Sequence, residues 1–102
     1  MSRTIRVAAV NDVPPGSSKE VMAEDQVVAL FNVDGVFYAM DGVCPHAGGP
    51  LGEGTLRGTT VTCPWHGWQF DVATGQNCLN RQMSHRCFAV KVEGNDVLIE
   101  IP

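Results

Sequence analysis

The sequence lacks an excess of positive charge, a long hydrophobic run and more than a few metal-binding side chains. It has 7 Lys and Arg against 11 Asp and Glu, for a formal net charge of −4. Because phosphate binding needs a clustered basic face, we expect no nucleic acid as the main partner. No run approaches the roughly 18–20 apolar residues of a membrane-spanning helix. Only 3 histidines and 4 cysteines are present, so any metal site with thiolate or imidazole ligands must draw on this small set.

The N-terminal segment also lacks the features of a secretory signal, because Arg6 interrupts its only apolar stretch. We therefore expect a cytoplasmic protein, whose cysteines are reduced thiols or metal ligands rather than disulfides. The length of 102 residues fits one domain, predicted over residues 1–102. The hydrophobic share of 44% and charged share of 18% are typical of a globular chain.

No segment shows a convincing helical stripe, and 11 Gly and 6 Pro indicate many turns. Val27, Ala29, Phe31 and Val33 recur at every second position, which is typical of a strand. Asp34-Gly35 separates this segment from another β-prone run and predicts a hairpin. The fold class predicted is all-β and antiparallel. We predict strands at residues 5–9, 26–33, 36–40, 59–62, 68–72, 88–92 and 97–101, with loops at 11–18, 41–51 and 63–67.

The loops at residues 41–51 and 63–67 hold the informative side chains. Each contains one thiol and one imidazole: Cys44 and His46 in the first loop, Cys63 and His66 in the second. The pattern is C-x-H-x16-C-x-x-H. A hairpin predicted between the loops is long enough to bring the two pairs together.

Three interpretations of this pattern compete. The first is chance, with two buried cysteines and two surface histidines. The second is a structural zinc site, since Cys₂His₂ satisfies tetrahedral zinc, although zinc fingers usually pair cysteine with cysteine and histidine with histidine. The third is a [2Fe–2S] cluster in which one iron binds two thiolates and the other two imidazoles. The mixed pairs favour the third interpretation, because each loop can supply one ligand to each iron.

Two segments carry a resemblance to a known family. CPHAGGPL at residues 44–51 and CPWHGWQFD at residues 63–71 resemble the cluster-binding loops of Rieske proteins. The chain is similar to the small soluble Rieske-type ferredoxins of bacterial multicomponent oxygenases. The resemblance implies an antiparallel β-sandwich or barrel with a small cluster-binding subdomain made of two loops. Carried over by position, Cys44 and Cys63 bind one iron, and His46 and His66 bind the other.

The glycines of these loops have two candidate roles. Gly48, Gly49 and Gly67 can let backbone N–H groups approach the bridging sulfides closely, which a side chain would obstruct. Alternatively, each glycine simply permits a turn.

The resemblance also implies a low reduction potential. Two ferric ions, two sulfides and two thiolates sum to zero formal charge, so the reduction potential is higher than that of a cluster with four thiolates. Within the Rieske family, however, the residues around the ligands favour a low value. High-potential Rieske proteins carry a disulfide where this chain has Gly49 and Trp65. They also carry hydroxyl groups where this chain has Trp68 and Phe70. Without hydrogen bonds from these hydroxyls to sulfur, we expect a potential near the family's lower limit of about −150 mV.

The segment at residues 76–86 departs from the family, because it has no proline where many such ferredoxins cover the cluster with a proline-bearing loop. Trp65 is interpreted as a hydrophobic lid or a docking residue, and Trp68 and Phe70 as core residues. For residues without a role at the site, we expect Cys78 and Cys87 to be buried or half-buried thiols and His85 to be a solvated strand residue.

Elimination favours an electron carrier over an enzyme. A non-haem iron oxygenase site needs two histidines and a carboxylate, and only His85 remains once His46 and His66 bind a cluster. No glycine-rich dinucleotide-binding fingerprint is present. The resemblance implies a monomer that accepts electrons from an NAD(P)H-dependent flavin reductase and donates them to a terminal, aromatic-ring-hydroxylating oxygenase. The alternative is a small subunit of a larger redox enzyme such as nitrite reductase.

Overall fold

The computed structural model describes residues 3–43, 49–65, 67–78, 82 and 85–101. Within these ranges the chain is almost entirely antiparallel β structure, which confirms the predicted fold class. A larger sheet runs in the order β1 (Arg3–Ala9), β9 (Asp96–Ile101), β8 (Cys87–Glu93), β4 (Val36–Asp41), β3 (Gln26–Val33) and β2 (Ser18–Ala23). A smaller sheet contains β5 (Thr55–Arg57), β6 (Thr60–Thr62) and β7 (Gln69–Asp71), and two short 3₁₀ helices are η1 (Val10–Asp12) and η2 (Leu51–Glu53).

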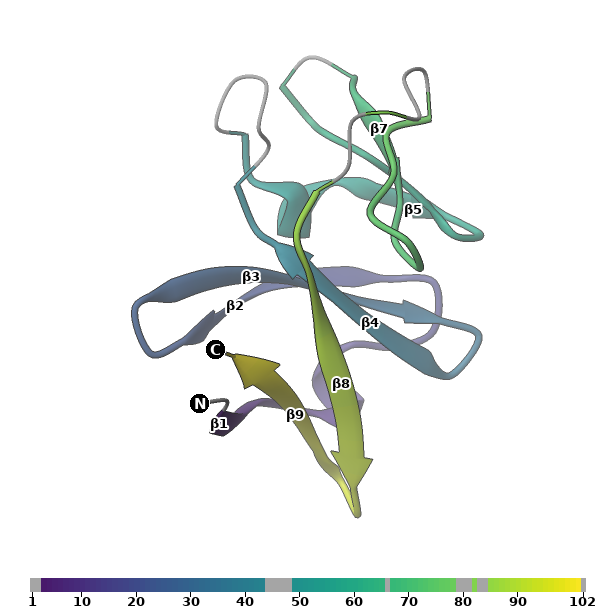
Figure 1. Cartoon of the computed structure of the whole chain (residues 1–102). Coiled ribbons are helices and arrows are strands. Elements are labelled where there is room, and N and C mark those ends of the chain that lie inside the picture. The colour runs from purple at the N-terminus through teal and green to yellow at the C-terminus, as the bar shows by residue number, and fades with distance from the viewer. Residues whose placement is uncertain (1–2, 44–48, 66, 79–81, 83–84, 102) are drawn as a thin grey trace.

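The smaller sheet lies at one end of the molecule, away from both termini. In Figure 1, β4 runs from the larger sheet toward η2 and the smaller sheet, and β8 begins at this junction and runs to the opposite end of the molecule, where the chain turns into β9. The pairing of β4 with β8 is short, with Ala39 opposite Phe88 and Met40 opposite Cys87. The two sheets are therefore joined by the chain segments that enter β8 and leave β4.

The hairpin predicted at Asp34-Gly35 is confirmed. Both residues have positive φ angles, 51° and 93°, and Val33 pairs with Val36 across the turn. A two-residue turn of this kind needs positive φ at both central positions, which aspartate tolerates and glycine adopts without strain.

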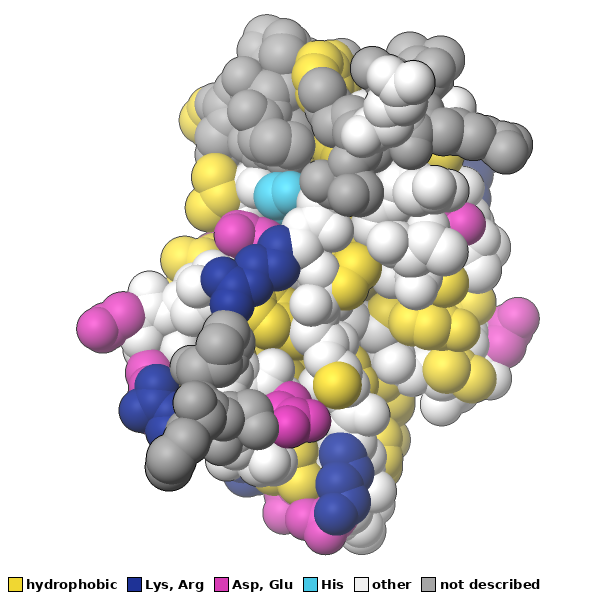
Figure 2. All heavy atoms as spheres, viewed as in Figure 1, with side chains coloured by type: hydrophobic (Ala, Val, Ile, Leu, Met, Phe, Trp, Pro, Cys, Tyr) yellow, Lys and Arg dark blue, Asp and Glu magenta, His cyan; other side chains and the backbone are white. Residues whose placement is uncertain are grey.

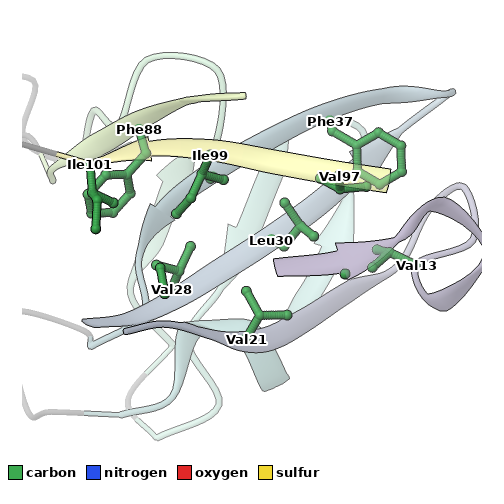
Figure 3. Close-up of a cluster of buried hydrophobic side chains, with 12 residues drawn as sticks. Val13, Val21, Val28, Leu30, Phe37, Phe88, Val97, Ile99 and Ile101 are labelled. Carbon is green, nitrogen blue, oxygen red and sulfur yellow. The ribbon is translucent and has the colours of Figure 1, made fainter. Parts of the chain in front are cut away.

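Strand β3 is buried on both faces and separates two hydrophobic cores. Val28 and Leu30 belong to the first core, which is enclosed by the strands of the larger sheet and is shown in Figure 3. Ala29 and Phe31 belong to the second core, which lies toward the smaller sheet. The second core consists of Ala29, Phe31, Met40, Leu51, Val61, Cys63, Phe70 and Val72. Each large apolar side chain buried here contributes about 1.5–3 kcal/mol to stability, so the second core holds the smaller sheet on the larger one.

The sequence prediction missed strand β2 and both short helices, η1 and η2. Residues 11–18 were predicted as a loop, but Val10–Asp12 form η1 and Ser18 begins β2. β2 has only Val21 and Ala23 buried, so its apolar pattern is too short to indicate a strand. Its backbone pairs with β3 from Ser18 to Ala23, and this tertiary pairing outweighs the polar residues at its start.

The described residues include no helix that is both long and apolar enough to cross a membrane.

Candidate metal centre

Of the four expected ligands, Cys63 is the one that lies within the described residues. It follows β6, and its side chain is buried, with 2% of its surface exposed. Cys44, His46 and His66 lie outside the described residues. Within the described ranges, no three or more His, Cys, Asp and Glu side chains gather into a group that could hold a metal ion. The described part of the site is the framework that positions Cys63, together with the bases of the two loops.

The backbone of the second loop is folded into a tight turn around Cys63. The Cys63 N–H donates to the Trp68 carbonyl oxygen at 2.7 Å, and the Gly67 N–H donates to the Cys63 carbonyl oxygen at 3.1 Å. These bonds satisfy both backbone groups of a buried residue, as burial requires. They fix the Cα of Cys63 and leave the thiol to be directed by the packing around it.

The base of the first loop is closed by backbone contacts. Val43 and Pro50 form an antiparallel bridge, and the Leu51 N–H donates to the Gly42 carbonyl oxygen at 3.0 Å. The Gly42 N–H in turn donates to the Val27 carbonyl oxygen at 3.0 Å. These bonds attach both ends of the first loop to β3 of the larger sheet.

The two loops meet where Gly49 faces Cys63. A Cβ atom placed on Gly49 would lie 2.8 Å from Cys63 Sγ and 3.0 Å from Trp65 Cγ. Real Cβ atoms essentially never come within 3.0 Å of such neighbours, so a side chain at this position would displace the thiol or the indole. The space around the Cys63 thiol is thus a cradle that only glycine leaves open. A buried thiol with a bare backbone opposite it fits an iron–sulfur cluster, whose sulfides need close backbone approach.

The absence of a side chain at Gly49 leaves room for the Cys63 thiol and the Trp65 indole. The predicted approach of its backbone N–H to bridging sulfides stays a prediction. Gly67 has a φ of 73° and nothing within 4 Å of a hypothetical Cβ, so its role is to permit the turn. Gly48 lies outside the described residues.

Aromatic side chains line the second loop. Trp65 is 58% exposed and adjoins Gly49, so it is open to a partner protein rather than enclosed. Phe70 is fully buried in the second core, as predicted, and Trp68 is partly buried against that core. The two rings lie 6.4 Å apart between centroids. Neither side chain offers the hydroxyl group that would hydrogen-bond cluster sulfur.

Two predictions about other cysteines were wrong. Cys78 and Cys87 are exposed, not buried or half-buried. Cys87 starts β8 at the edge where Gly75 approaches, and its thiol donates to the His85 carbonyl oxygen at 3.7 Å. Although the residue as a whole is exposed, desolvation of its thiol, and secondly the charge of Asp71, raise the pKa of Cys87.

The prediction for His85 was also wrong. It precedes β8 rather than lying in it, and it is partly buried. Its Nε2 lies 2.9 Å from the Asp41 carbonyl oxygen, and its ring lies 5.6 Å from that of Phe70 between centroids. Because Asp41 is 44 residues away in the sequence, no local spacing could have indicated this contact.

Comparison with known proteins identifies the family. A family model described as "Rieske [2Fe-2S] domain" matches residues 3–98. A naphthalene 1,2-dioxygenase system ferredoxin component from Pseudomonas aeruginosa is 34% identical over 98 residues, covering 95% of this chain and 94% of the relative.

Two solved structures share the fold. A complex of reduced oxygenase and oxidized ferredoxin in carbazole 1,9a-dioxygenase contains a chain that matches with a TM-score of 0.85 and 32% identity, covering 94% of this chain and 91% of that one. A putative NADH-dependent nitrite reductase small subunit from Mycobacterium tuberculosis matches with a TM-score of 0.88, covering 100% and 97% of the two chains. Its identity is 22%, so that likeness concerns the fold alone. With a family model that matches residues 3–98 and a relative that is 34% identical along 95% of its length, the chain belongs to the Rieske [2Fe–2S] domain family.

Proposed function

We propose that this chain is a one-electron carrier, not an enzyme, and that it delivers electrons to a terminal oxygenase of the aromatic-ring-hydroxylating type. The observation that carries the proposal is the match along 95% of the chain to the ferredoxin component of a dioxygenase system. The Rieske family supplies the cofactor, one [2Fe–2S] cluster per chain. When bound, the cluster accepts and releases one electron. We also propose that residues 1–102 form one domain and act as a monomer in the cytoplasm.

We assign Cys44 and Cys63 to one iron and His46 and His66 to the other. The C-x-H-x16-C-x-x-H pattern supports the assignment, because its two thiols and two imidazoles match the Rieske donor set. The burial of Cys63 and the contact between its loop and Gly49 support it further. The backbone bonds of Cys63 to Trp68 and Gly67 hold this ligand in place.

The two aromatic residues that follow the second loop support a low reduction potential. Trp68 and Phe70 occupy the positions from which hydroxyl groups hydrogen-bond sulfur in high-potential members, and neither side chain carries a hydroxyl group. Hydrogen bonds to sulfur stabilise the extra electron, so their absence lowers the potential. We expect a midpoint near about −150 mV.

The exposed part of the second loop supports docking of a partner close to the cluster. Trp65 and Pro64 are exposed beside buried Cys63, and Val43 is 45% exposed at the end of the first loop. Aromatic side chains of this kind are enriched in protein interfaces. On the face shown in Figure 2, acidic and basic side chains are interspersed, with no broad patch of one sign. Apolar contact is therefore the better-supported basis for recognition on this face.

The donor in this scheme is an NAD(P)H-dependent flavin reductase. Reconstitution tests the proposal: the purified ferredoxin is mixed with a flavin reductase and a ring-hydroxylating oxygenase, and NADH-dependent product formation is measured. Product that depends on this chain supports the carrier function. Reduction of the chain without electron flow to any such oxygenase, together with stable co-purification in a nitrite reductase, would favour the subunit alternative.

A further inference from the structure

His85 contacts the strand that leads into the first loop and the strand that follows the second loop of the proposed cluster site. Its side chain bonds to Asp41, which ends β4 three residues before Cys44. Its ring packs on Phe70 of β7, which follows the second loop. Its backbone N–H donates to the Gly75 carbonyl oxygen at 2.7 Å, in the turn after β7. One residue thus bonds to the segment that enters the first loop and packs on the segment that leaves the second.

On the side of the first loop, the contact is a defined hydrogen bond. The Asp41 carbonyl oxygen can only accept, so the His85 Nε2 at 2.9 Å carries the proton and donates. The neighbouring backbone strengthens this attachment, because the Asp41 N–H donates to the Arg86 carbonyl oxygen at 2.8 Å. The Asp41 carboxylate in turn accepts from the Val43 N–H at 3.0 Å. The position of residues 41–43 therefore depends on residues 85–86.

On the side of the second loop, the contact passes through buried aromatic rings. Phe70 is fully buried, with its ring 5.6 Å from His85 and 6.4 Å from Trp68 between centroids. The Trp68 carbonyl oxygen accepts from the Cys63 N–H at 2.7 Å. A change in the His85 ring is therefore transmitted to Cys63 by packing and one hydrogen bond, because a dense core does not absorb displaced volume freely.

The turn at Gly75 is shaped to receive this segment. A Cβ on Gly75 would overlap the His85 carbonyl oxygen and lie 2.8 Å from Cys87 Sγ. Gly75 also has a φ of 81°, which favours glycine. The close approach of the turn to residues 85–87 is thus a specific feature of this backbone.

We propose that His85 is a positioning residue that fixes the separation of the two cluster-binding loops. This role rests on the proposed cluster site. The donated hydrogen bond holds the first loop, and the ring packed on Phe70 holds the second. Loss of either contact lets the two loops move apart, so that water reaches the cluster. Since the reduced cluster carries more negative charge than the oxidised one, added solvent stabilises it and raises the reduction potential.

The test compares variants that remove one contact at a time. His85→Phe keeps a ring against Phe70 and removes the donor, whereas His85→Gln keeps an N–H donor and removes the ring. His85→Met fills similar space without either and serves if His85→Phe does not fold. Arg86→Gln is the matched control, because its backbone bond to Asp41 is retained and the guanidinium that it removes lies over the ring of Phe88, at 5.1 Å from the centroid.

The readouts are the EPR spectrum of the reduced protein, the midpoint potential, and the rate at which visible absorption is lost in a chelator. We expect the cluster absorption of His85→Phe to disappear about fivefold faster than that of the wild type, which is the change that loss of one hydrogen bond produces. Its g-values should shift and its midpoint potential should rise. His85→Gln keeps the hydrogen bond to Asp41 but loses the ring contact with Phe70, so its spectrum and potential should lie between those of the wild type and those of His85→Met, which lacks both contacts. Arg86→Gln should match the wild type in all three measurements.

Two results would overturn the inference in distinguishable ways. If the loaded wild type and His85→Phe share one spectrum and one potential, and differ only in melting temperature, His85 supports the fold but does not position the loops. If the wild type binds no iron, the proposed function fails and the inference fails with it.

Discussion

Substitution of Gly49 by alanine isolates the contact between the two loops. The added Cβ would lie 2.8 Å from Cys63 Sγ and 3.0 Å from Trp65 Cγ, well inside the ~3.5 Å at which carbon atoms pack favourably. Overpacking of this kind costs about 1–3 kcal/mol. Because Cys63 is held by backbone bonds at both its N–H and its carbonyl, the strain should fall on its thiol and on the Gly49 backbone. We therefore expect Gly49→Ala to impair cluster binding.

Gly58→Ala is the matched control for Gly49→Ala. Gly58 lies in the turn between β5 and β6, with a φ of 58° and nothing within 4 Å of a hypothetical Cβ. Alanine there costs about 1–2 kcal/mol of backbone strain, a similar loss of stability without contact to Cys63. The assay is iron and acid-labile sulfide per chain, with the melting temperature of each variant. Gly49→Ala should lose most of its iron while Gly58→Ala keeps it. Equal iron content in the two variants would refute the cradle at Cys63.

Three further results are expected. Cys63→Ser should abolish the visible and EPR spectra, whereas Cys78→Ser, at an exposed position, should leave both unchanged; a normal spectrum from Cys63→Ser would contradict the ligand assignment. Trp65→Ala should change the free energy of unfolding by no more than about 0.5 kcal/mol, because the side chain is 58% exposed. It should nevertheless slow electron transfer to the oxygenase; an unchanged transfer rate would exclude docking through this indole. Desolvation of the thiol and the Asp71 carboxylate raise the pKa of Cys87. In the Cys78→Ser protein at about pH 8, the Cys87 thiol should therefore react slowly with an aromatic disulfide, and Asp71→Asn should speed this reaction. An unchanged rate in Asp71→Asn would argue against the electrostatic contribution.

The features that depend on a few adjacent residues could be predicted from the sequence. The turn at Asp34-Gly35 follows from the positive φ angles that these residues tolerate. The alternation in residues 26–33 predicted a strand, but β3 proved to be buried on both faces. Periodicity alone marked Ala29 and Phe31, which belong to the second core, as one face, and could not show that Val28 and Leu30 are buried in the first core.

The features that depend on tertiary pairing could not be predicted. β2 starts with Ser18, Lys19 and Glu20, which suggest a loop, and it becomes a strand because β3 supplies its hydrogen-bonding partner. Likewise, Cys87 is exposed despite its place in a β-prone segment, because β8 meets β4 over only two residue pairs and its outer face is open.

The candidate site was indicated by its motif and is described in part. The spacing of cysteine and histidine pointed to both loops, and the structure brings them together at Gly49 and Cys63. The assignments of Cys44, His46 and His66 stay predictions, because these residues lie outside the described ranges. His85 carried no signal in the sequence, since its contacts with Asp41 and Phe70 arise only when the two sheets pack together.

Elemental and spectroscopic assay of the purified, anaerobically handled chain tests the central claim most directly. The account predicts two irons and two acid-labile sulfides per chain, with an EPR signal on reduction whose hyperfine structure changes when histidine is labelled with ¹⁵N. A colourless protein with one zinc and no sulfide would contradict it.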